Sequence, residues 1–292
     1  MPCACVDIGS NTTRLLLAEA GSDGTLRELM TQRVFTRIGK SIRKDGSIPR
    51  AKVEETTAVV ERQVRHAREL GAKRIAIVAT AAVRQARNGG ALAEAIEGAA
   101  GLPVTVLSED EEARLAFLGA SRTLGTEVDG NLAVVDVGGG STEIAIGAPD
   151  EGVLWARSFR IGSGFLADSY LHSDPPAVKE LDAARAHACG VFEGLSTPPV
   201  AQAVAVGGSA TSLRRMAGAE LTYDALERAI RLLASAPAHE IATRFELDPE
   251  RVRLLPAGVL ILEAAGDVLG KPLRIGNGGI REGVVLELAA GC

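Results

Sequence analysis

Two short stretches of this chain repeat one design, in which an apolar strand ends in an aspartate and runs into a turn of glycine, serine and threonine. The first copy is Val6-Asp7-Ile8-Gly9-Ser10-Asn11-Thr12, and the second is Val135-Asp136-Val137-Gly138-Gly139-Gly140-Ser141-Thr142. Positions 7 and 136 are 129 residues apart, which is about the length of one domain. An internal duplication on this scale predicts two related lobes that face each other across a cleft.

Strand and helix patterns alternate in both halves of the chain, which is typical of an α/β fold. In the first half, strands are expected at 4–8, 14–20, 74–78 and 104–107, and helices at 51–70 and 109–122. A charged connection is expected to follow the second strand and to end at 45–46, and helical sequence follows the strand at 74–78 as far as about residue 99. In the second half, strands are expected at 132–137, 143–147, 153–160 and 203–206, with helical stretches at 177–194 and 223–269. The expected lobes are residues 1–124 and 125–279, with a last helix in 280–292 that packs back on the first lobe.

The two glycine-rich turns are candidate phosphate-binding loops. Glycine lets successive backbone N–H groups converge on an anion, and serine and threonine hydroxyls add donors. An aspartate repels phosphate, so its useful role is to hold a metal ion or its waters against the phosphate oxygens. A plain glycine hairpin explains either loop alone equally well, but two matched copies favour phosphate. Neither loop has the sequence pattern of a P-loop nucleoside triphosphatase or of a Rossmann dinucleotide-binding turn.

A run of four acidic residues begins the helix expected at 109–122. Ser108 and Glu111 fit a capping box, and the acidic first turn suits the helix dipole. Glu112 instead shares a face with the apolar positions three, four and seven residues later, where partial burial would make it a better general base. An exposed glutamate at the edge of the apolar face remains the alternative. Thr80, Arg84 and Asn88 follow a strand end, where functional residues of α/β sheets gather.

Composition limits the choice of ligand. Hydrophobic residues make up 46% of the chain and charged residues 24%, as in ordinary globular proteins. The net charge of −5 disfavours a general nucleic-acid binder and requires that a polyanionic substrate meet local positive charge. No apolar run has the length of a membrane span, and no secretory signal is visible at the start. A cytoplasmic protein without membrane or nucleic-acid partners is expected.

Taken in order, several segments resemble the exopolyphosphatase / guanosine pentaphosphatase family. They are the two loops, Thr80 to Asn88, Glu111-Glu112-Ala113-Arg114-Leu115, Asp136 to Glu143, Gly207-Gly208-Ser209-Ala210-Thr211, Leu255-Pro256-Ala257-Gly258 and Arg281-Glu282-Gly283. The resemblance implies two actin-like (ribonuclease H-like) lobes with the active site between them. It implies Glu112 as the general base, Arg84 on substrate phosphate, and Asp136 and Glu143 as metal-binding residues. The implied phosphate contacts are Asp7, Gly9, Ser10, Asn11, Thr12, Gly138, Gly139, Gly140, Ser141, Thr142, Gly207 and Gly208.

The same resemblance implies the reaction and its cofactor. We expect hydrolysis of the terminal phosphate of inorganic polyphosphate with Mg²⁺, with a monovalent cation such as K⁺ as a further candidate ion. Longer members carry C-terminal helical domains, so short polyphosphate chains are expected here, and a homodimer is the expected assembly. Hydrolysis of guanosine pentaphosphate is the main alternative. A kinase on the same fold and a non-catalytic nucleotide or phosphate sensor are the others; the sensor would not need Glu112.

Overall fold

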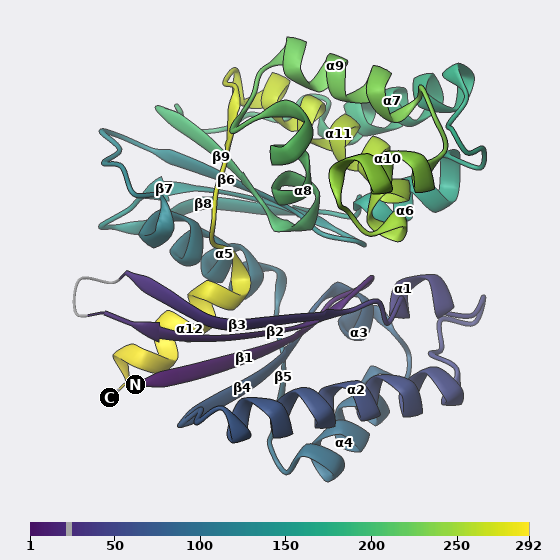
Figure 1. Ribbon diagram of the computed structural model, residues 1–292. Helices are drawn as coiled ribbons and strands as arrows, with labels where there is room; N and C mark the ends of the chain where they lie inside the picture. Colours follow the sequence, from purple (N-terminus) through teal and green to yellow (C-terminus); the bar gives the residue numbers. More distant parts are fainter. Residues whose placement is uncertain (22–24, 292) are drawn as a thin grey trace. The chain divides into compact units, whose positions relative to one another are not determined.

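The computed structural model describes residues 1–21 and 25–291 of the chain. These residues form two α/β units (Figure 1). One unit comprises Met1–Thr123 together with Gly278–Cys292, and the other comprises Leu124–Asn277. The last segment expected to return to the first lobe, 280–292, lies in the first unit, and only its residue 292 falls outside the described residues.

The first unit is built around a sheet of five strands. Its elements in chain order are β1 (Pro2–Ile8), β2 (Thr13–Ala20), β3 (Leu26–Val34), α1 (Ile38–Ser41), α2 (Arg50–Glu69), β4 (Arg74–Ala79), α3 (Ala81–Gln85), α4 (Gly89–Ala100), β5 (Val104–Val106), α5 (Glu109–Thr123) and α12 (Ile280–Ala290). The strand order is β3-β2-β1-β4-β5. The three strands β1 to β3 pair antiparallel, whereas β4 pairs parallel with β1 and with β5.

Helices cover both faces of this sheet, as the alternation of side chains along its central strands requires. Ala4, Val6 and Ile8 of β1 belong to one apolar core, which they share with residues of α2 and α4. Cys3 and Cys5 belong to a second core, which they share with residues of α5 and α12. Side chains alternate between the two faces of a strand, and Asp7 is two residues after Cys5. Asp7 therefore lies on the same face as the two cysteines, which is the face that α5 and α12 cover.

The second unit repeats this plan. Its elements are β6 (Leu132–Val137), β7 (Thr142–Ala148), β8 (Gly152–Phe159), α6 (Ser163–Tyr170), α7 (Val178–Phe192), β9 (Gln202–Val206), α8 (Gly207–Ala217), β10 (Glu220–Leu221), α9 (Tyr223–Leu233), α10 (Ala238–Phe245), α11 (Pro249–Leu269) and β11 (Leu273–Ile275). The order β8-β7-β6-β9-β11 reproduces the order of the first sheet, with β10 added at the edge. The antiparallel and parallel pairs also match, so the duplicated turns stand at equivalent places in two copies of one topology.

Several elements differ from those expected from the sequence. The stretch expected as a charged connection contains the strand β3, an edge strand whose side chains are mostly exposed and which therefore shows no apolar alternation. The helices α6 and α8 were not expected, because both begin in glycine-rich sequence that is typical of turns. The helical stretch at 223–269 is three helices, α9 to α11. Within residues 1–21 and 25–291, every helix is too short or too polar to cross a bilayer.

Candidate active site

The first loop is a tight four-residue connection between β1 and β2. Ile8 and Thr13 are cross-strand partners, and the loop closes with a hydrogen bond of 3.0 Å from the Gly9 N–H to the Thr12 carbonyl. A Cβ at position 9 would lie 3.2 Å from that carbonyl, so a glycine is the residue that fits there without displacement. The Nδ2 atom of Asn11 is buried and has no hydrogen-bond partner among the described residues, which leaves a donor for a ligand.

The second loop has the same geometry. Val137 and Thr142 are cross-strand partners, and the Gly138 N–H donates to the Ser141 carbonyl at 3.0 Å. A Cβ at position 138 would lie 3.0 Å from that carbonyl. The two loops therefore share length, register and closing hydrogen bond, although only one of them contains a run of three glycines.

The helix α6 holds the second loop from behind. The N–H groups of Ser163 and Gly164 donate to the carbonyls of Gly138 at 2.9 Å and Gly139 at 3.0 Å. Gly162, just before the helix, lies so close that a Cβ would be 2.4 Å from the carbonyl carbon of Gly139. These supporting residues were not singled out in the sequence, where the run Gly162-Ser163-Gly164 was the only signal.

The aspartate of the first copy is half-buried near the end of β1. Burial raises the pKa of Asp7, while the positive charges of Arg14 and Arg281 act in the opposite direction. Its Oδ1 atom is buried and accepts no hydrogen bond from the residues that the structure describes. Arg14 is its partner across β1 and β2, and was not among the predicted site residues. A buried carboxylate oxygen without a donor fits contact with a cation or its water.

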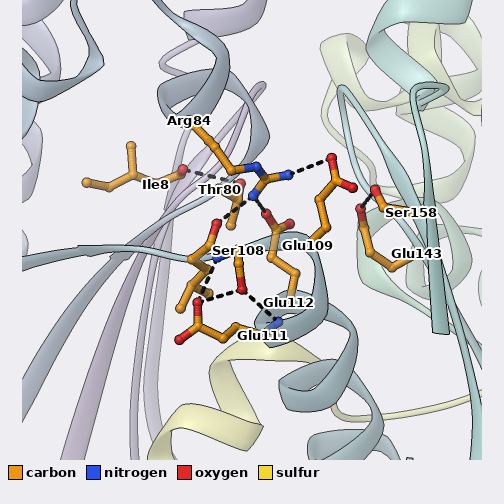
Figure 2. Close-up of polar contacts among 10 residues, drawn as sticks. Ile8, Thr80, Arg84, Ser108, Glu109, Glu111, Glu112, Glu143 and Ser158 are labelled. Carbon is orange, nitrogen blue, oxygen red and sulfur yellow. Dashed lines mark hydrogen bonds and ion pairs between the residues drawn. The ribbon is translucent and has the colours of Figure 1, made fainter. Parts of the chain in front are cut away.

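The second copy places a glutamate where the first has Arg14. Asp136 and Glu143 are direct cross-strand partners on β6 and β7, and both are nearly buried, at 9% and 3% exposure. Side chains of such partners lie on one face of the sheet and close together, so the two carboxylates meet at one place. The Ser158 hydroxyl donates to Glu143 Oε1 at 2.8 Å, which fixes that carboxylate (Figure 2). Asp136 and Glu143 thus fit Mg²⁺, which often binds through one or two carboxylates and several waters.

The helix α8 begins against Asp136. Gly207 has φ +84, and a Cβ at this position would lie 2.5 Å from Asp136 Oδ1. Only a residue without a side chain can occupy both that backbone conformation and that distance. The Gly208 carbonyl accepts a 2.8 Å hydrogen bond from the Ser212 hydroxyl inside the helix. Of the predicted glycine pair, Gly207 therefore lies at an aspartate of the site, and Gly208 is part of the helix behind it.

Glu112 and Arg84 come together in the first unit (Figure 2). Glu112 is 2% exposed at the start of α5, whereas Glu109, Asp110 and Glu111 are exposed. Arg84, in the last turn of α3, donates through Nη1 to Glu112 Oε1 and, at 2.6 Å, to the Leu107 carbonyl. Its Nη2 atom lies 3.7 Å from Glu109 Oε1 and makes no hydrogen bond to any described residue. The expected burial of Glu112 is confirmed, and the ion pair adds a partner that the sequence did not indicate.

The capping box at the start of α5 also forms as predicted. Glu111 Oε2 accepts from the Ser108 N–H at 2.8 Å, and the Glu111 N–H contacts the Ser108 hydroxyl at 3.2 Å. These hydrogen bonds, from the Ser108 backbone first, lower the pKa of Glu111. The local sequence therefore accounts for Glu111 and leaves Glu112 as the buried member of the acidic run.

Three of the polar residues that the sequence indicated as site candidates make side-chain hydrogen bonds within the protein. The Thr142 hydroxyl is fully buried and donates to the Ile161 carbonyl at 2.6 Å. Asn88 pairs with the backbone of Ile48 through both ends of its amide, at 2.7 and 3.0 Å. The Thr12 hydroxyl accepts a 3.2 Å hydrogen bond from Arg14. The side chains of Thr142 and Asn88 therefore already make hydrogen bonds to the backbone of the protein.

Comparison with known proteins identifies the family. The family model described as the Ppx/GppA phosphatase family matches residues 18–290. This chain belongs to the Ppx/GppA phosphatase family. Membership makes it a phosphohydrolase, so the kinase and the non-catalytic sensor no longer apply as alternatives.

Individual relatives in the Ppx/GppA family extend over nearly the whole chain. Exopolyphosphatase 2 of Mycobacterium tuberculosis is 29% identical over 98% of this chain and 98% of its own. A Ppx/GppA crystal structure from Aquifex aeolicus is 28% identical, with a TM-score of 0.80 over 100% of this chain and 98% of the other. An exopolyphosphatase structure from Cytophaga hutchinsonii, 21% identical with a TM-score of 0.88, supports the fold alone. The expected actin-like α/β fold with two lobes is confirmed.

Proposed function

We propose that this phosphohydrolase is an exopolyphosphatase, which releases the terminal phosphate of inorganic polyphosphate by attack of a water that Glu112 activates. The observation that carries the proposal is the buried Glu112, held by Arg84 in the first unit. The name of the Mycobacterium tuberculosis relative, exopolyphosphatase 2, supports the choice of substrate because the two chains cover each other almost completely.

Glu112 has the features that a general base requires. It is nearly buried, it is fixed by an ion pair, and the helix α5 that carries it is anchored by its capping box. A carboxylate held at one position can accept the proton of a water as that water attacks phosphorus. Acid–base catalysis of this kind contributes on the order of 10²–10⁴ in rate.

Arg84 divides its two terminal nitrogens between two tasks. Nη1 binds Glu112 and the Leu107 carbonyl, which orients the base. Nη2 is buried and without a hydrogen bond among the described residues, so it is the donor available for a phosphoryl oxygen. Transfer of a phosphoryl group depends mostly on positioning and charge neutralisation, and a planar guanidinium provides both.

The two loops bind the remaining phosphate oxygens in this proposal. The N–H groups of residues 9–12 and 138–141 and the Asn11 amide supply donors, and the serine hydroxyls add to them. Asp136 and Glu143 are the residues that would hold Mg²⁺. Bound there, Mg²⁺ would neutralise charge on the phosphate oxygens. Among the described residues no group of three or more His, Cys, Asp or Glu side chains could hold a metal ion by itself. Substrate oxygens and water would be the further ligands of Mg²⁺.

The test is phosphate release from tripolyphosphate, long-chain polyphosphate, guanosine pentaphosphate and ATP, with and without Mg²⁺. Wild type is expected to act on polyphosphate in a magnesium-dependent way. Glu112→Gln should lower kcat by about 10²–10⁴, because the amide cannot accept the proton.

Glu111→Gln is the matched control, one residue away on an exposed part of the same helix. It should keep its activity and lose only part of the cap, about 0.5–1 kcal/mol of stability. Full activity of Glu112→Gln would contradict the mechanism. A strong preference for guanosine pentaphosphate over every polyphosphate would instead assign the alternative substrate, which the family name also covers.

A further inference from the structure

The residue that follows each loop is a fully buried threonine. Thr13 and Thr142 begin β2 and β7, and both are 0% exposed. They occupy equivalent places in the repeat, because Thr13 is the cross-strand partner of Ile8 and Thr142 is that of Val137. A buried hydroxyl costs free energy unless it finds a hydrogen-bond partner inside the protein. The partner of each threonine therefore shows what this position does in the repeat.

In the first unit, the partner is Thr36, which is also 0% exposed. The hydroxyl oxygens of Thr13 and Thr36 are 3.0 Å apart and share one hydrogen bond. The side-chain amide of Gln63 on α2 donates to the Thr13 carbonyl at 3.4 Å. The beginning of β2 is thus tied to the chain segment between β3 and α1 by polar contacts that water does not reach.

The segment that begins with Thr36 also holds the first loop. The Arg37 N–H donates to the Asn11 carbonyl at 2.9 Å, and the Gly39 N–H donates to the Ser10 carbonyl at 2.9 Å. Gly39 packs closely there, since a Cβ would lie 3.3 Å from the Cβ of Ser10. We call residues 36–39 the first holding segment.

The second unit repeats this arrangement with different residues. The Thr142 hydroxyl donates to the Ile161 carbonyl at 2.6 Å. Directly after Ile161, the N–H groups of residues 163–165 donate to the carbonyls of Gly138 and Gly139 at 2.9 to 3.0 Å. We call residues 161–165 the second holding segment. In both units, a buried threonine hydroxyl ties the strand after the loop to the segment that binds the loop carbonyls.

The bound carbonyls decide where the N–H groups of each loop point. In a trans peptide, the C=O of one residue and the N–H of the next point in opposite directions. The first holding segment binds the carbonyls of residues 10 and 11, so the N–H groups of residues 11 and 12 point away from it. By the same reasoning, the N–H groups of residues 139 and 140 point away from the second holding segment. None of these four N–H groups donates in a backbone hydrogen bond among the described residues, which leaves four donors for phosphate oxygens.

We propose that Thr13, Thr36 and Thr142 are positioning residues, whose buried hydroxyls fix the two holding segments and so aim the loop N–H groups at substrate phosphate. This inference rests on the proposed phosphate contacts of the loops and deepens them. A hydrogen bond weakens steeply as its angle departs from linear, so a loop that tilts binds phosphate less well. Each threonine therefore acts on the substrate through the loop beside it.

The first test removes the hydroxyls singly. Thr36→Val and Thr142→Val should each raise KM for tripolyphosphate about tenfold, because donors to a charged group are misdirected. The value of kcat should change much less, since these contacts form in the ground state and the transition state alike. The pH profile of kcat/KM should keep its wild-type shape, because Glu112 is not altered. Thr36→Ser and Thr142→Ser keep the hydroxyl and should restore KM to within about twofold of wild type.

A double variant separates positioning from stability. In Thr13→Val/Thr36→Val both partners become apolar groups of similar shape, so the melting temperature should return close to that of wild type. The link to the first holding segment is still absent, so KM should stay raised. A return of KM to the wild-type value together with the melting temperature would overturn the inference, since it would show that the hydroxyls serve stability alone.

Thr56→Val is the matched control. Thr56 lies on α2 and is 0% exposed like the three positioning residues, but its hydroxyl makes no hydrogen bond to a described residue. The change should leave KM and kcat within about twofold of wild type. A rise in KM as large as that of Thr36→Val would contradict the inference, because loss of any buried hydroxyl would then have the same effect.

Direct binding separates this inference from the proposed activity. Calorimetry with tripolyphosphate and Mg²⁺, in a Glu112→Gln background, should give a Kd about tenfold higher when Thr36→Val or Thr142→Val is added. Weaker binding in these variants, without hydrolysis of any substrate by wild type, would reject the exopolyphosphatase activity and keep the positioning role. Hydrolysis by wild type with unchanged KM and Kd in the variants would reject the positioning role and keep the activity. Absence of tripolyphosphate binding in the Glu112→Gln background and in wild type would overturn both.

Discussion

Asp7 carries an energetic cost in the folded protein. Its pKa is raised by burial, so the folded state holds the proton more tightly than the unfolded state does. As pH rises from the ordinary carboxyl value through the raised folded value, the wild type loses stability, because the charged form must be buried. Such a cost is what the proposed contact of Asp7 with a ligand would explain.

The prediction is that Asp7→Asn raises the melting temperature by a few degrees at pH 7 in a chelator, and abolishes most activity. The difference should shrink as pH falls below 3.8, the ordinary carboxyl value, where both proteins are neutral at this position. Thermal melts across pH 3 to 8 measure it. A variant that is less stable than wild type at pH 7 would show that Asp7 is a structural anion.

The burial of single residues was partly predictable. Successive residues of a helix are turned by about 100°, so one member of four in a row meets the core while the others meet solvent. That argument located Glu112 from the sequence. It could not supply Arg84, which is 28 positions away and reaches Glu112 only through tertiary packing. It also could not distinguish Thr142, whose hydroxyl is used inside the fold, from the loop residues beside it.

Among the elements, α5 and α12 approach each other unusually closely. A Cβ at Gly283 of α12 would lie 2.2 Å from the Leu115 carbonyl of α5, and a Cβ at Gly119 of α5 would lie 2.1 Å from the Gly279 carbonyl. Glycines on both sides therefore let the two backbones meet. Because α5 carries Glu112, this contact also fixes the helix of the proposed base.

Gly283→Ala should destabilise the protein by about 1–3 kcal/mol, since the helices must separate to admit the methyl group. Gly98→Ala is the control, because Gly98 lies exposed on α4 with no atom within 4 Å of its would-be Cβ. That change should stabilise by about 0.5–1 kcal/mol through helix propensity. Chemical denaturation of both variants measures the difference. Equal stabilities of the two variants would mean that the α5–α12 contact is loose.

Elements with apolar periodicity were predicted, and elements without it were not. The central strands β1 and β6 are mostly buried, so their sequences are apolar runs from which a strand can be predicted. The edge strand β3 and the helix α8 depend on backbone pairing and on a glycine start, neither of which leaves an apolar repeat. The sequence therefore describes the centre of each sheet better than its margins.

At the scale of the whole molecule, the repeat of one short motif predicted the repeat of a whole topology. The two sheets share the order and direction of five strands, and the loops of both close with the same hydrogen bond. The division of the chain is less symmetrical. The second unit is continuous from Leu124 to Asn277, whereas the first needs both ends of the chain.

This division predicts unequal fragments. Residues 124–277 contain a complete apolar core, so the fragment should melt cooperatively by circular dichroism. Residues 1–123 lack α12, whose Val284 and Val285 pack with Leu115 and Cys5, and should bind a hydrophobic dye until a peptide of 278–291 is added. A cooperative melt of 1–123 alone, without dye binding, would show that α12 is dispensable for folding.

The return of α12 to the first sheet sets an order for synthesis on the ribosome. One face of β1, the first strand in chain order, packs in a core that includes Val284 and Val285 of α12. These two valines are translated about 280 codons after β1. At about 5–20 residues per second, the nascent chain carries that incomplete face for tens of seconds while Leu124–Asn277 emerges and can fold. The early half of this protein is therefore the part that a ribosome-associated chaperone would need to shield.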